Sequence, residues 1–167
     1  MVVSTEAVKE LRERTGAGVM DCKRALEEVN GDLDKATEIL RQRGLALAEA
    51  KAHRVTMQGL VECYIHAGGR IGAMVELNCE TDFVARTDSF KALAHDLAMQ
   101  VAAMGPLSIS PDDLPPGAEG EPSELCLLLQ PFIRDPAHTI QDLITDAIAQ
   151  TKENIQVRRF ARFELGQ

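Results

Sequence analysis

Cysteine and histidine, the side chains that most often carry covalent or metal chemistry, are scattered along this chain of 167 residues. The sequence contains no C-x-x-C pair and no histidine at ligand spacing from a cysteine, which argues against zinc. It also contains no arrangement of a nucleophile beside a histidine base. We therefore expect no catalytic residue, no metal and no cofactor, and we expect the cysteines to be small buried apolar side chains. The cysteines are Cys22, Cys63, Cys79 and Cys126, and the histidines are His53, His66, His95 and His138.

One glycine-rich stretch, Thr15-Gly16-Ala17-Gly18, has the composition of a phosphate-binding loop. It joins two expected helices rather than a strand and a helix, and no Lys-Ser or Lys-Thr pair follows it. Its simpler interpretation is a tight turn between helices, where glycine tolerates unusual backbone angles. The other common catalytic motifs are also missing from the sequence. The pattern predicts a binding protein rather than an enzyme.

The net charge of −8 is unevenly distributed, because acidic residues outnumber basic ones only after residue 54. Phosphate backbones repel such an acidic chain, so we expect no nucleic-acid partner. No apolar run is long enough to span a bilayer, so we expect no membrane partner. The sequence starts with Met1-Val2-Val3-Ser4 and passes directly into an amphipathic pattern. The lack of a basic or apolar leader predicts a cytoplasmic protein.

The hydrophobic pattern of the first part of the chain has the period of short helices. One helix is expected from Ser4 to Thr15, and a second is expected around Cys22, whose apolar neighbours recur at helical spacing. Asp32 can cap a third helix, and Gly44 stands where a C-terminal cap glycine belongs. We predict a three-helix module over residues 1–43 and a helical connector over 44–54.

The period then changes to that of strands. Alternating apolar residues on both sides of the turn at 67–70 predict an antiparallel hairpin, and a third strand is expected at the end of the chain. A long helix starts near Thr87 or Asp88. The stretch 105–122 contains five of the seven prolines, which is typical of a loop, and helices are expected near 123–130 and 139–151. The sequence thus predicts an α+β fold, with a core domain over residues 55–167 built on a three-stranded sheet.

The junction between the hairpin and the long helix is the most distinctive segment, because it has two interpretations. Thr81 can cap a helix and Asp82 suits its first turn, so Phe83 could simply extend the buried stripe of one continuous helix. Against this, Thr87-Asp88 has the pattern of a new helix start, and a break there would turn Phe83 away from the core. Periodicity alone slightly favours the structural interpretation.

Three runs of sequence resemble the elongation factor Ts family, in its order and spacing and from end to end of the chain. The first run, from Leu11 to Leu26, is similar to the family's N-terminal signature, LRERTGAGVMDCKRAL. The second, NCETDFVA from Asn78 to Ala85, resembles its second signature. The third, ENIQVRRF from Glu153 to Phe160, is similar to its C-terminal strand.

The resemblance implies a guanine-nucleotide exchange factor for elongation factor Tu, with an N-terminal module of ubiquitin-associated type. By matching position, Arg12, Val19 and Met20 would dock this module on the partner's GTPase domain, although many members of the family carry methionine where this chain has Val19. Asp82 and Phe83 would push between helices beside the partner's Mg²⁺ site, while Thr81 and Val84 would hold that wedge.

The chain has material for one core half, as in the short members of the family, and this resemblance implies a homodimer. Tyr64 and Phe160, expected on the sheet face opposite the aliphatic stripe, are the candidate interface residues. Two other interpretations stay open at this point. In one, the module binds ubiquitin-like or nascent-chain partners and the core is structural. In the other, the protein is a mitochondrial member of the family, which the missing basic leader disfavours.

Overall fold

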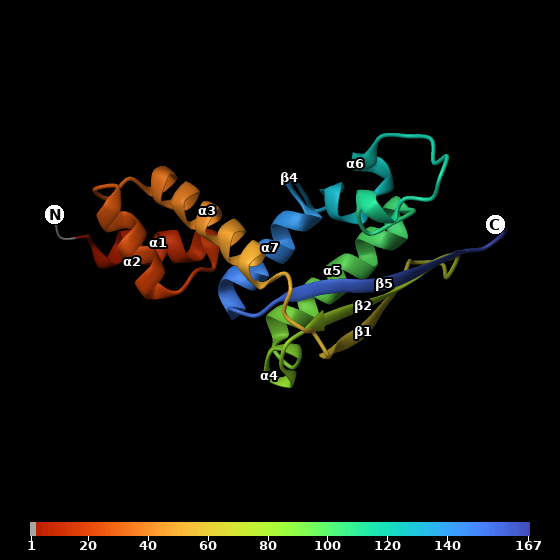
Figure 1. Ribbon diagram of the computed structural model, residues 1–167, viewed down its shortest axis with the longest axis horizontal. Helices are drawn as coiled ribbons and strands as arrows, with labels where there is room; N and C mark the ends of the chain where they lie inside the picture. Colours follow the sequence, from red (N-terminus) through yellow and green to blue (C-terminus); the bar gives the residue numbers. More distant parts are fainter. Residues whose placement is uncertain (1–2) are drawn as a thin grey trace. The chain divides into compact units, whose positions relative to one another are not determined.

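The computed structural model describes residues 3–167 and divides into two compact units (Figure 1). The first unit consists of Met1–Arg54 with Thr145–Asn154, and the second of Val55–Ile144 with Ile155–Gln167. The α+β fold expected from the sequence is confirmed, including its three-stranded antiparallel sheet. The likeness of the first module to a ubiquitin-associated domain stays a prediction.

The first unit contains three helices whose starts follow from their capping residues. These are α1 (Thr5–Thr15), α2 (Val19–Glu28) and α3 (Leu33–Lys51). The Asp32 side chain accepts a hydrogen bond from the Lys35 amide at 3.0 Å, so the predicted cap of α3 is confirmed. At the start of α1, the Ser4 hydroxyl accepts one from the Ala7 amide at 3.1 Å and is the cap of that helix. The helices enclose a small core of fully buried side chains, namely Leu11, Cys22, Ala25, Leu26 and Ala36.

The prediction that the third helix ends at Gly44 is wrong, because α3 continues without a break to Lys51. Gly44 is buried in the middle of the helix, where a Cβ atom would lie 3.4 Å from the Cβ of Ala149 and 3.6 Å from the Cγ2 of Thr145. Both neighbours belong to the end of α7 (Ile140–Thr151), which packs on this side of α3 within the first unit. The glycine therefore serves close helix packing rather than helix termination.

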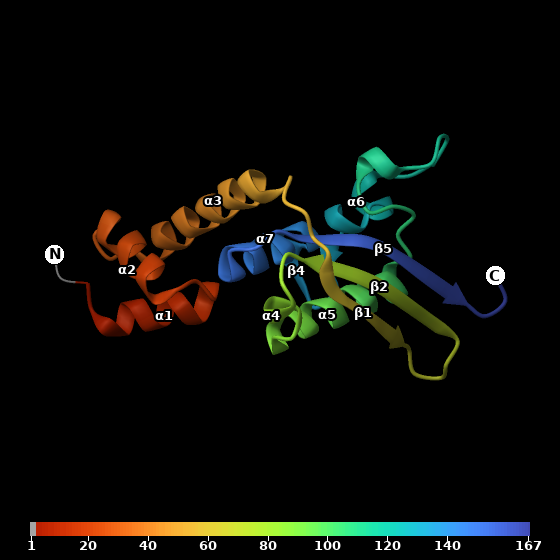
Figure 2. The same cartoon turned by 60° about the horizontal axis from the view of Figure 1, so that its bottom comes forward.

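The second unit is built on an antiparallel sheet in which β2 lies between the other two strands. The strands are β1 (Gln58–Ile65), β2 (Ile71–Cys79) and β5 (Ile155–Glu164), in the order β1-β2-β5. Helix α5 (Asp88–Met104) covers one face of the sheet, as Figure 2 shows behind the strands. The core between them is aliphatic, and its fully buried members include Val75, Leu77, Leu97 and Val101.

A β-bulge in β5 changes which of its side chains face the core. Leu77 pairs with Val157 but the preceding Glu76 pairs with Arg159, so Arg158 is an extra residue in the strand. Before the bulge the odd-numbered Ile155 and Val157 lie on the side of α5, and after it the even-numbered residues do. An unbroken period of two therefore assigns the wrong face to the second half of this strand.

The predicted positions of Tyr64 and Phe160 are corrected by this register. Tyr64 pairs with buried Ala73, and its ring packs edge-on against His95 of α5 with centroids 5.7 Å apart. Phe160 pairs with fully buried Val75, which follows Ala73 by two residues in β2 and therefore lies on the same face of the sheet. Both rings are half-buried on the face that α5 covers, not on a face open to another subunit.

The segment between α5 and α7 is more irregular than the sequence predicted. Its elements are short: Pro111–Asp113, α6 (Pro122–Leu125), Leu127–Leu129, β3 (Pro131–Phe132) and β4 (Asp135–Thr139). The helix expected over 123–130 is thus only one turn of α-helix and one of 3₁₀-helix, and the small β3-β4 ribbon was not predicted. Two fully buried amides secure the segment, since Gln100 donates to the Gln130 side chain and to the Pro131 carbonyl, each at 3.1 Å.

Substitutions at Gly44 should distinguish packing from capping. Gly44→Ala fits the observed space and should raise the free energy of unfolding by up to about 1 kcal/mol, because alanine favours the helix interior. Gly44→Leu should lower the free energy of unfolding by roughly 1–3 kcal/mol through overpacking against Ala149. Urea denaturation of the two variants measures both changes. Destabilisation by alanine as large as that by leucine would contradict the packing role.

Candidate functional site

The segment that follows β2 forms a separate one-turn helix, α4 (Asp82–Ala85), braced at both ends. The Thr81 hydroxyl caps it by accepting from the Val84 amide at 3.4 Å, and the Cys79 thiol donates to the Thr81 carbonyl at 3.1 Å. Ala85 is buried and Val84 half-buried, and α4 packs against β1 and β2. These contacts fix a helix that is too short to be stable alone.

The break between α4 and α5 is made by Thr87. Its hydroxyl donates to the Val84 carbonyl at 2.8 Å and accepts from the Phe90 amide at 3.3 Å. The first bond satisfies a carbonyl at the end of α4, and the second caps the start of α5. The second of the two interpretations from the sequence is therefore confirmed, since α5 begins anew and Phe90, rather than Phe83, starts its buried stripe.

Phe83 points away from the core, with 80% of its surface exposed. Beside it, the Asp82 carboxylate forms an ion pair with Arg86 at 2.8 Å, one turn along the chain. Burying an exposed phenylalanine in a partner's pocket is worth roughly 1.5–3 kcal/mol. The segment thus presents an apolar ring beside a carboxylate on a fixed backbone, an arrangement suited to insertion into a partner rather than to acid-base chemistry.

The other predicted contact residues lie on the first unit, at the corner between α1 and α2. Arg12 is exposed near the end of α1, and Val19 and Met20 are exposed by 50% and 61% at the start of α2. Gly16 closes α1 in the left-handed region, at φ 65°, and allows the tight turn between the helices.

Asp21 follows Met20 and is held by two cations. The Arg24 guanidinium lies 2.6 Å from its carboxylate, and the Lys152 ammonium 3.4 Å away. Mainly through the hydrogen bond from Arg24, with a further contribution from Lys152, the pKa of Asp21 is lowered from its ordinary value. A charged carboxylate therefore borders the exposed Val19 and Met20 side chains.

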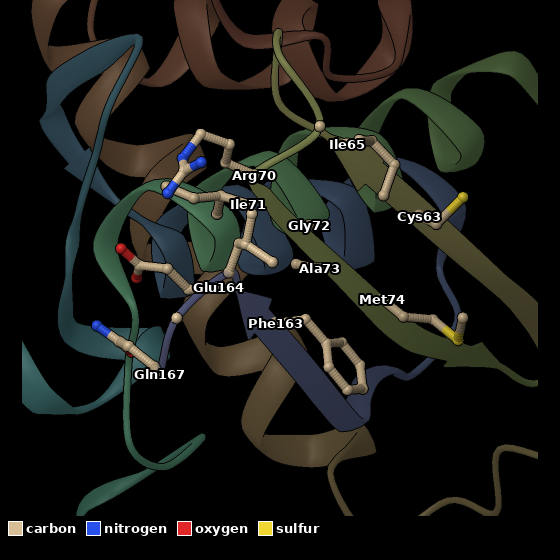
Figure 3. A pocket seen from close by; sticks show the side chains of 13 residues that line it. Cys63, Ile65, Arg70, Ile71, Gly72, Ala73, Met74, Phe163, Glu164 and Gln167 are labelled. Carbon is tan, nitrogen blue, oxygen red and sulfur yellow. The ribbon is translucent and has the colours of Figure 1, made fainter.

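A third exposed surface was missed in the sequence, namely the sheet face that α5 does not cover. We call it the uncovered sheet face, and its apolar side chains, each exposed by at least half, are Val61, Ile65, Met74 and Phe163. In Figure 3, Met74 of β2 and Phe163 of β5 border a shallow hollow of about 530 Å³. The alternation of apolar residues in β1 indicates that one face of the strand is apolar. The sequence does not show which face of the sheet α5 covers.

The possible metal ligands and the cysteines of the described residues form no common site. Among residues 3–167 there is no group of three His, Cys, Asp or Glu side chains that could hold a metal ion. Cys22, Cys79 and Cys126 are buried as expected, whereas Cys63 is exposed on the uncovered sheet face. Within the same range, no helix has the length and apolar character needed to cross a membrane.

Comparison with known proteins gives a family-model match to part of the chain and matches to individual relatives over nearly all of it. A family model described as Elongation factor TS matches residues 27–122. Elongation factor Ts of Carboxydothermus hydrogenoformans is 52% identical over an alignment of 196 positions, which covers 99% of this chain and 90% of that protein. Those of a Thermoanaerobacter species (strain X514) and of Heliobacterium modesticaldum are each 50% identical, covering 99% of this chain and 96% and 91% of those proteins.

Matches of this extent place the chain among the factors of translation elongation. The chain belongs to the elongation factor Ts family.

Proposed function

We propose that the protein is a guanine-nucleotide exchange factor for elongation factor Tu that acts in the cytoplasm without catalysing a chemical reaction. It binds the GDP form of the GTPase, disturbs its Mg²⁺ and phosphate site, and promotes GDP release until GTP binds. The observation that carries the proposal is the exposure of Phe83 on a braced one-turn helix. Membership of the elongation factor Ts family supports the choice of partner.

The mechanism follows from linkage between two ligands of one GTPase. A factor that favours a GTPase conformation with a poor phosphate site lowers the affinity for GDP, and GDP lowers the affinity for the factor by the same ratio. Mg²⁺ is the main counter-charge of the nucleotide phosphates, so displacing its ligands weakens nucleotide binding. Phe83 inserts between helices of the GTPase, and Asp82 brings negative charge close to the metal site. Thr81 and Val84 hold α4 in place for this insertion.

The corner formed by Arg12, Val19 and Met20 provides the second contact in this proposal. Two apolar side chains exposed beside charged ones are typical of a small docking surface. In this proposal the corner holds the factor on the GTPase domain and adds affinity, while the disturbance of the nucleotide site is left to α4.

The protein is further proposed to act as a homodimer. The uncovered sheet face offers a second copy several exposed apolar side chains on a regular surface, including Met74 on the central strand and Phe163 beside it. An isologous contact places the same face of each copy against the other, which a sheet face of this kind permits. Tyr64 and Phe160 lie on the other face of the sheet, the one that α5 covers, so this proposal puts the present set in their place.

Phe83→Ala tests the wedge. We expect release of labelled GDP from elongation factor Tu to slow by tenfold or more, since buried aromatic anchors contribute about 2 kcal/mol or more. The free energy of unfolding should change by less than about 0.5 kcal/mol because the side chain is exposed. Leu107→Ala, which alters another exposed apolar residue, is the control. Stopped-flow release rates equal to those of the wild type would show that Phe83 is not the wedge and would favour the structural role of the core.

Met20→Gln tests the docking corner separately. We expect the Kd for elongation factor Tu to rise by roughly tenfold, equivalent to about 1.4 kcal/mol, with little change in the release rate at saturating factor. Lys35→Gln, on an exposed position of α3, is the control. Titration calorimetry measures the Kd, and an unchanged value would remove Met20 from the interface. A lowered saturating rate with unchanged Kd would assign this corner to nucleotide displacement instead.

Met74→Glu tests the homodimer. A carboxylate placed in the middle of an apolar interface loses its water shell, so the wild-type dimer should become a monomer. The exposed position of Met74 should let the variant fold, which circular dichroism checks. Light scattering measures the mass, with Met104→Glu as the control. A wild-type protein that is monomeric at working concentrations, or a Met74→Glu variant that stays dimeric, would contradict this assembly.

A further inference from the structure

The chain entering β1 carries two exposed apolar side chains to which no role has been assigned. Val55 is exposed by 74% and Met57 by 80%, as much as Phe83. Both belong to the second unit, and they lie three residues and one residue before Gln58, the first residue of β1. Neither packs into the core, so their apolar character does not serve the stability of the fold.

The backbone that presents Met57 is fixed by three contacts. Gln58 pairs with Cys79, and the side-chain amide of Asn78 donates to the Thr56 carbonyl at 3.4 Å. Gly59 lies against β2 so closely that a Cβ atom would be only 2.1 Å from the Leu77 carbonyl oxygen, and its φ of +145° also favours glycine. Met57 is therefore held by residues on both sides in sequence and is not carried on a free linker.

This stretch lies at the same end of the sheet as the wedge. Because Gln58 pairs with Cys79, the start of β1 is level with the end of β2, two residues before Thr81 caps α4. Helix α4 packs against β1, and in Figures 1 and 2 the start of β1 lies beside α4 in both views. One end of the sheet thus presents Met57 and Phe83, each largely exposed on a fixed backbone.

We propose that Met57, supported by Val55, is a second apolar anchor for the GTPase and contacts its surface next to the pocket that Phe83 enters. This inference rests on the proposed function and adds a residue to its interface. A fixed backbone lowers the entropy that binding must remove, which favours such side chains as anchors. The flexible, polarizable thioether of methionine gives an apolar contact that can adapt to a partner's surface. The continuity with α4 identifies the occupant as the partner that Phe83 contacts.

Met57→Gln is the test, because glutamine keeps the length of the side chain and removes its apolar character. We expect the Kd for elongation factor Tu to rise five- to tenfold in titration calorimetry, whereas Met57→Leu should stay within twofold of the wild type. Met104→Gln is the matched control, since Met104 is an exposed methionine at the other end of α5. A helix of that length places it about 25 Å from the start of α5. Thermal unfolding should be unchanged in all three variants.

Parallel measurements separate this inference from the proposed function. If Phe83→Ala weakens binding while Met57→Gln and Met104→Gln both match the wild type, Met57 is not an anchor and the exchange function stands. If the wild type does not bind elongation factor Tu at all, the proposed function and this inference fall together. A Met57→Leu variant as weak as Met57→Gln would also overturn the inference, because an apolar contact should tolerate leucine.

Discussion

The hydroxyl of Thr87 satisfies the last turn of one helix and the first turn of the next. By donating to the Val84 carbonyl and accepting from the Phe90 amide, it lets the chain stop α4 and restart as α5 within two residues. If the two were one continuous helix, the spacing of seven residues would align Phe83 with buried Phe90. Because of the break, α5 can pack on the sheet while Phe83, on α4, points away from the core. Phe83 can therefore stay exposed while Phe90 starts the buried stripe of α5.

The core that supports this end of the molecule is aliphatic, and three of the exposed apolar residues stand on backbone that is held in place. Phe83 stands on a capped turn, Met57 beside a glycine that tolerates close approach, and Met74 on the central strand. In each case the backbone is fixed by hydrogen bonds while the side chain lacks apolar neighbours on one side. Exposed apolar groups of this kind add nothing to folding stability and gain free energy only when a partner covers them. Of these residues, Phe83 and Met57 serve the proposed contact with the GTPase, and Met74 serves the proposed homodimer.

Much of this fold could be predicted from the sequence because its determinants are local. The caps at Ser4 and Asp32, the hairpin turn and the fresh helix start at Thr87 each depend on neighbouring residues. The role of Gly44 does not follow from its neighbours in sequence. Its packing partner, Ala149, is more than a hundred positions away in the chain. The sequence leaves two directions open for Phe83, because periodicity alone does not show whether the helix continues through Thr87 or breaks there. Its meaning as a contact came from the family motif rather than from its pattern.

The bulge at Arg158 has a consequence for how this strand tolerates insertions and deletions. It allows one strand to turn Ile155 toward α5 at its start and Phe163 toward the opposite face at its end. Removing a single residue here would leave the strand almost as long as before, yet it would invert the second half. Arg162, which now donates to the Ala102 carbonyl of α5 at 3.0 Å, would exchange faces with its neighbours. A strand whose sequence carries several arginines is thus a place where the length of the chain is tightly constrained.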